Sequence, residues 1–197
     1  MNNELIKEVI KAEENVIVDF VELGIDSFLD EGVVKDIPII GSIVGIYKIG
    51  KSIRDAFFIK KLINFIYNLK NISTKERQKF IDKCIYEDKN FQEKLICTLD
   101  KIDDIDKCKY LSKIFICYGK GYITYLEFRR YMIAIERLNV ENILYLKVNI
   151  DKKYFDFQHG VSLLNAGLVE IAMFPGNAGY EKTDETIQLY KCLFEYE

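Results

Sequence analysis

The chain has 197 residues, of which 49% are hydrophobic and 30% are charged, and its formal net charge is −3. This composition excludes a disordered chain and provides enough apolar surface for one domain or two small ones. The five cysteines form no CxxC pair and the only histidine is His159, so the sequence predicts no metal site and no cofactor.

The N-terminal residues 4–29 are predicted to form one or two helices, because apolar residues recur there every three or four positions. The first residues are polar and acidic, unlike a signal peptide. The chain also lacks a run of about 18 uncharged apolar residues, the length that a membrane-spanning helix needs. We therefore expect a cytoplasmic protein that can associate peripherally with the inner face of the membrane.

The next segment, residues 37–50, is the most apolar of the chain, and a helical pattern follows it to Leu69. Residues 1–36 carry ten acidic and three basic side chains, whereas residues 37–83 carry three acidic and ten basic ones. Apolar residues beside basic ones are typical of segments that dock on anionic membranes. The alternative is a buried helix with a solvated basic rim. The candidate surface for a membrane or protein partner consists of Ile39, Ile40, Ile43, Val44, Lys48, Lys51, Arg54, Lys60 and Lys61.

The same segment matches the P-loop signature G-x-x-x-x-G-K-[ST], through Gly45, Gly50, Lys51 and Ser52. In a P-loop, backbone amides surround the phosphates of a nucleotide and the lysine binds them. The inner positions are bulky here, and the chain lacks the alternating strands and helices of a parallel sheet. The pattern thus favours glycines that allow close helix packing, with nucleotide binding as an alternative.

The middle of the chain is predicted to be helical and to contain two capping boxes. Ser73 with Glu76, and Thr124 with Glu127, have the spacing in which each side chain binds the other residue's backbone N–H. The sequence Gly119–Gly121 predicts a turn. One helix is expected to begin at Ser73 and to carry Phe80, Ile81 and Cys84, and the others are expected at residues 90–99, 105–118, 124–138 and 140–147.

The C-terminal segment changes character. A short helix at 158–167 is predicted to end at Gly167, and a β-hairpin with a five-residue loop, 175–179, follows it. Thr183 then begins a last helix. This is the layout of a winged helix, but the segment has a net negative charge and its helix offers no Arg or Lys, so we do not expect nucleic-acid binding.

Three parts of the sequence resemble a group of bacterial proteins associated with abortive infection, the Abi-alpha type. They are the apolar motif Lys35–Gly45, the stretch GYITYLEFRRYMIAI in the middle, and the late pattern LLNAGLVEI followed by GYEKTDETIQLY. The resemblance implies a role in defence against phage and brings no active-site residue with it.

The sequence therefore predicts a mainly α protein, with a helical bundle (1–147) followed by a small winged-helix-like C-terminal unit with one β-hairpin (151–197) packed on it. We expect a non-enzymatic effector or interaction protein without catalytic residues, acting through residues 37–61. The alternatives are a nucleotide-binding protein and a protein–protein scaffold that uses the C-terminal unit.

Overall fold

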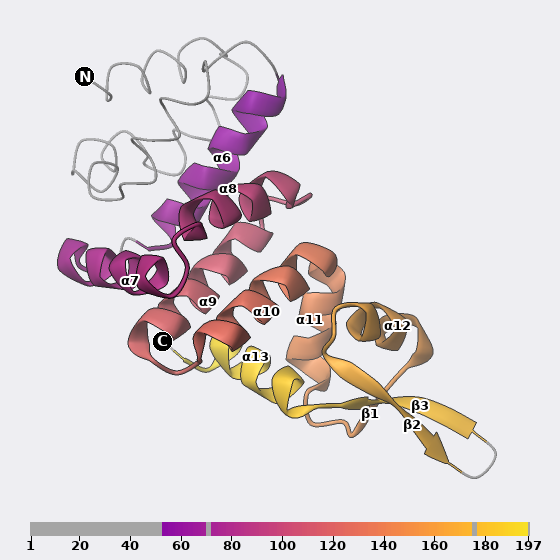
Figure 1. Ribbon diagram of the computed structural model, residues 1–197. Helices are drawn as coiled ribbons and strands as arrows, with labels where there is room; N and C mark the ends of the chain where they lie inside the picture. Colours follow the sequence, from indigo (N-terminus) through magenta and orange to yellow (C-terminus); the bar gives the residue numbers. More distant parts are fainter. Residues whose placement is uncertain (1–52, 70–71, 175–176, 197) are drawn as a thin grey trace. The chain divides into compact units, whose positions relative to one another are not determined.

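The computed structural model describes residues 53–69, 72–174 and 177–196, and these residues are mainly helical (Figure 1). A small antiparallel sheet near the C-terminus completes the fold, so the predicted fold class is confirmed. The helices expected between residues 4 and 50 lie outside the described residues. The chain divides into two compact units between residues 93 and 94, and the boundary predicted near residue 150 falls inside the second unit.

Among its described residues, the first unit contains two complete helices, α6 (Ile53–Tyr67) and α7 (Thr74–Glu87), and the start of α8 (Phe91–Lys101). The predicted capping box at the start of α7 is present: the Glu76 amide donates to Ser73 Oγ at 3.3 Å, and the Ser73 amide donates to Glu76 Oε2 at 3.2 Å. The buried Arg77 donates to the Leu69 carbonyl at 3.1 Å. Because carbonyl groups just beyond a helix end need donors, this bond ties the end of α6 to α7.

The described residues of the second unit form most of α8 and five further helices. They are α9 (Lys107–Lys120), α10 (Tyr125–Arg137), α11 (Val140–Asn149), α12 (Phe157–Asn165) and α13 (Asp184–Phe194). The turn predicted at Gly119–Gly121 is present only from Gly121 onward, because α9 continues to Lys120. Only Gly121 leaves the helix, with φ +83°, and the Tyr122 amide donates to the Cys117 carbonyl at 2.9 Å. This is the usual glycine ending of a helix.

The core of the second unit centres on α9, which packs against α10 and α13. The rings of Tyr118 and Phe128 stack with centroids 5.0 Å apart. Each buried aromatic or aliphatic side chain of this kind contributes roughly 1.5–3 kcal/mol. Cys108, Cys117 and Cys192 are also buried in this unit, as small apolar residues, whereas Cys97 is exposed.

The sheet has three antiparallel strands, β1 (Tyr154–Phe155), β2 (Val169–Phe174) and β3 (Asn177–Lys182), in the order β1-β3-β2. The sequence did not predict β1. The predicted length of the hairpin loop, five residues, is also wrong. Phe174 pairs with Asn177, so only two residues connect the strands. Residues 177–179 have low strand propensity, but pairing with β2 overrides such local preferences.

Helix α12 covers one face of this sheet at very short range, because Gly160 lies directly against the ring of Tyr180. A Cβ atom at position 160 would be 2.1 Å from Cδ2 of Tyr180 and 2.8 Å from its Cβ. Glycine is therefore the residue that allows helix and strand to approach this closely. The last helical residue is Asn165, and Gly167 follows the C-cap residue with φ +75°, the C′ position predicted for this glycine.

No helix in the described ranges is both long and apolar enough to cross a membrane.

Candidate binding pocket

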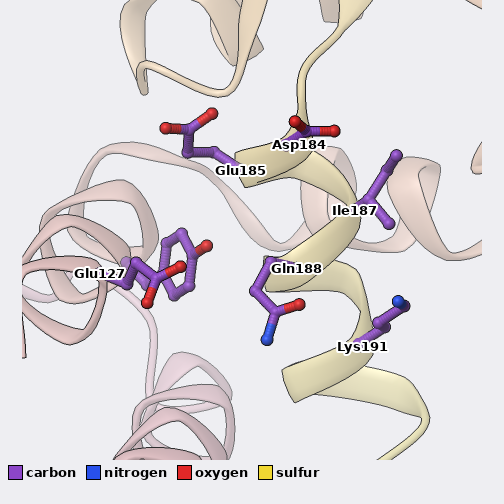
Figure 2. Close-up of a pocket in the computed structure, with 7 residues that line it drawn as sticks. Glu127, Asp184, Glu185, Ile187, Gln188 and Lys191 are labelled. Atoms are coloured by element: carbon purple, nitrogen blue, oxygen red, sulfur yellow. The ribbon is translucent and has the colours of Figure 1, made fainter. Parts of the chain in front are cut away.

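A pocket of about 310 Å³ lies between α10 and α13 in the second unit (Figure 2). Figure 2 shows Glu127 extending from α10 toward α13, with Glu185 and Gln188 on the near side of α13. Ile187 and Lys191 extend from its other side. The residues that line the pocket are Glu127, Tyr131, Asp184, Glu185, Ile187, Gln188 and Lys191.

Glu127 is fixed in place by the second predicted capping box, which is also present. The backbone amide and the hydroxyl of Thr124 both donate to Glu127 Oε2 at 2.7 Å, and the Glu127 amide donates to Thr124 Oγ1 at 3.3 Å. Because both bonds to the carboxylate end on Oε2, Oε1 keeps its capacity to accept a hydrogen bond.

The other wall is the first half of α13, which Thr183 and Thr186 anchor. Both hydroxyls donate to the carbonyl of Leu168, Thr183 Oγ1 at 2.7 Å. Glu185 follows in the first turn and pairs with Arg130 of α10. Acidic residues in a first turn complement the helix dipole, so helix stability is enough to explain the position of Glu185.

Tyr131 is the lining residue that helix stability does not explain. It is four residues beyond Glu127 on the same face of α10 and is 0% exposed. Its hydroxyl group is buried and has no hydrogen-bond partner among the described residues. Burial, together with the charges of Glu127 and Glu185, raises the pKa of Tyr131, so the hydroxyl stays protonated at neutral pH. A buried polar group without a partner costs about 1–3 kcal/mol, which a ligand in the pocket would offset.

The only histidine forms a local cluster at the start of α12. His159 Nδ1 lies 2.9 Å from Oδ1 of Asp156, and its ring stacks on Tyr145 of α11 at 3.8 Å. Burial opposes ionisation of Asp156, but hydrogen bonds from the His159 amide, the Tyr145 hydroxyl and the His159 ring lower the pKa of this carboxyl. The cluster caps α12 and holds it to α11. In the part of the chain that the structure describes, no group of three His, Cys, Asp or Glu side chains is placed to hold a metal ion.

Most residues of the sequence-predicted sites lie outside the described residues. This applies to Ile39, Ile40, Ile43, Val44, Lys48 and Lys51 of the docking surface, and to Gly45, Gly50, Lys51 and Ser52 of the P-loop match.

The backbone of Arg54 lies in the first turn of α6. Further along this helix Lys60 is partly exposed, whereas Lys61 is buried, with 7% of its surface exposed. Lys60 is thus better placed than Lys61 to present its charge to a partner.

The pocket itself was not predictable from the sequence, because its two walls are more than 50 residues apart along the chain. Glu127 was recognised only as a helix cap. The usable signal was Tyr131, a polar hydroxyl within the apolar stripe of a helix, but a tyrosine in such a position usually finds a partner.

No family model, curated protein or solved structure matches this chain. Its function is therefore inferred from its own residues.

Proposed function

We propose that this chain is an interaction protein without chemistry of its own, and that it binds a positively charged group of its partner in the pocket between α10 and α13. The observation that carries the proposal is the buried hydroxyl of Tyr131, which lies in the same pocket as the carboxylates of Glu127 and Glu185 and has no hydrogen-bond partner among the described residues. Helix capping accounts for Glu127 and the helix dipole accounts for Glu185, but neither accounts for this hydroxyl. Five of the seven lining residues belong to α13, in the segment that the sequence suggested as a protein-binding scaffold.

The Glu127→Gln variant is expected to weaken binding of a cationic partner about tenfold or more, because a hydrogen bond to a charged group contributes roughly 1.5–3 kcal/mol. Glutamine also serves in a capping box, so the melting temperature should not change. We would titrate a peptide that alternates glycine with lysine and arginine, and follow binding by calorimetry.

Glu170→Gln is the matched control, since it removes an exposed carboxylate from β2, outside the pocket. It should bind the peptide as the natural protein does. Equal affinity of the Glu127→Gln variant and the natural protein would show that the pocket is not the binding site.

A second candidate function is docking to an anionic membrane through residues 37–61, which the excess of basic residues between 37 and 83 favours. On α6, Phe57 is 51% exposed and Lys60 is partly exposed. Together with the resemblance to abortive-infection proteins, this supports an effector that acts at the membrane during phage defence.

Flotation with anionic liposomes tests this second function. Changing Lys48, Lys51 and Lys60 to Glu should abolish flotation, because each lysine near an anionic surface contributes about 1 kcal/mol. Ile43→Asp should have the same effect. The control changes the exposed Lys79, Lys89 and Lys152 to Glu, with the same total charge. If both triple variants float equally well, residues 37–61 do not form the docking surface.

A further inference from the structure

The pocket holds three oxygen acceptors that no described residue uses. Glu127 offers Oε1, since Thr124 occupies only Oε2. Gln188 donates through Nε2 to the carbonyl of Tyr122 at 3.1 Å, which leaves its Oε1 as an acceptor. The third acceptor is the hydroxyl oxygen of Tyr131. They come from two different helices and are therefore not constrained to one plane.

The charge of the pocket is negative on the side of these acceptors. Arg130 already compensates Glu185, with which it pairs, whereas no basic side chain of the described residues forms an ion pair with Glu127. Lys191 extends from the other side of α13 (Figure 2). Asp184 is exposed at the start of the helix, where solvent and salt weaken its field.

We infer that the ligand group is a primary ammonium, such as a lysine side chain or the end of a polyamine, rather than a guanidinium. An ammonium carries three N–H donors on a compact, freely rotating group, which suits three acceptors held on two helices. This inference rests on the proposed function, because it names the class of cation that the same pocket takes.

The two facing carboxylates also disfavour a guanidinium. A guanidinium binds best when both oxygens of one carboxylate accept a pair of parallel N–H bonds. Thr124 occupies one oxygen of Glu127, and Arg130 occupies one oxygen of Glu185. Arg130 thus sets the specificity of the pocket, since it keeps Glu185 from serving as a bidentate acceptor.

The test is a titration of the full chain with three small cations at pH 7, followed by the chemical shifts of the backbone amides of α10 and α13. The probes are n-butylamine, n-butylguanidine and n-butyltrimethylammonium, which has the charge but no N–H group. We expect the amine to bind about fivefold to tenfold more tightly than the other two, the ratio expected from one or more hydrogen bonds. The Glu127→Gln change should lower the affinity for n-butylamine about tenfold, and Glu170→Gln should leave that affinity unchanged.

The outcomes separate the two proposals. Tighter binding of the guanidine, or equal binding of the trimethylated probe, would contradict the inference that the ligand group is a primary ammonium. The proposed cation-binding function would remain. No shift at α10 or α13 with any probe overturns both, as does amine binding that Glu127→Gln leaves unchanged. The Arg130→Met variant provides an independent measurement. Because it frees both oxygens of Glu185, it should shift the preference of the pocket toward the guanidine. An unchanged ratio of the two affinities would show that Arg130 does not set the specificity.

Discussion

Gly160→Ala is expected to destabilise the protein, although alanine in the middle of a helix is ordinarily more favourable than glycine by about 1 kcal/mol. The new methyl group would lie 2.1 Å from Cδ2 of Tyr180 and 2.8 Å from its Cβ. The latter atom is attached to the backbone of β3, so a change of rotamer cannot clear the space. Helix and strand must separate, at a cost of about 1–3 kcal/mol for an overpacked site. Thermal unfolding should show a melting temperature lower by about 2–12 °C.

Ser162→Ala, in the same helix, is the control for helix propensity and should leave the melting temperature unchanged or raise it slightly. Tyr180→Ala removes two of the three close atoms, so in that background Gly160→Ala should cost less, as expected for residues in contact. A Gly160→Ala protein that is more stable than the natural one would mean that α12 does not approach β3 this closely.

Helix starts were predictable from the sequence because their signals are local. Ser73 and Thr124 each precede a glutamate by three residues, and both capping boxes are present in the structure. Thr183 begins α13 as expected, with its hydroxyl accepting from the Thr186 amide. These interactions need only neighbours three residues away, so no knowledge of the tertiary fold was required.

Features that depend on pairing across the chain were not predictable in the same way. The hairpin loop was placed over residues 175–179 because Gly and Asn dominate there, yet β3 begins at Asn177 as part of the sheet. The two-residue strand β1 exists only because it pairs with Glu181 and Tyr180. The reason for a glycine at position 160 likewise appears only when β3 lies against α12.

The candidate pocket belongs to this second class. Glu127 looked like a helix cap, and it is one; its second oxygen acquires a possible role only because α13 brings Glu185 and Gln188 near it. The spacing of the apolar residues in this amphipathic helix predicts only that Tyr131 faces the interior. Whether its hydroxyl has a partner depends on the other helices around it, which the sequence does not order in space.

Tyr131→Phe is expected to change stability and ligand binding in opposite directions. The variant keeps the buried ring and removes only a hydroxyl that has no partner among the described residues. Deleting a buried unsatisfied group should raise the free energy of unfolding by up to about 1–3 kcal/mol. The same hydroxyl is one of three acceptors for the ligand, so affinity for n-butylamine should fall about tenfold or more, because a hydrogen bond to a charged group contributes roughly 1.5–3 kcal/mol. Denaturant unfolding and the amide titration measure the two effects on the same protein.

Tyr145→Phe is the matched control, because the Tyr145 hydroxyl does have a partner: it accepts from the Asp156 amide at 3.3 Å. Its loss should lower stability by about 1 kcal/mol and leave amine binding unchanged. If Tyr131→Phe instead lowers stability as Tyr145→Phe does, the Tyr131 hydroxyl is satisfied in the free protein, and the observation that supports the pocket is lost. A gain in stability with a loss of affinity would identify Tyr131 as a residue kept at the expense of stability for the sake of binding, as is common where function requires an unsatisfied group.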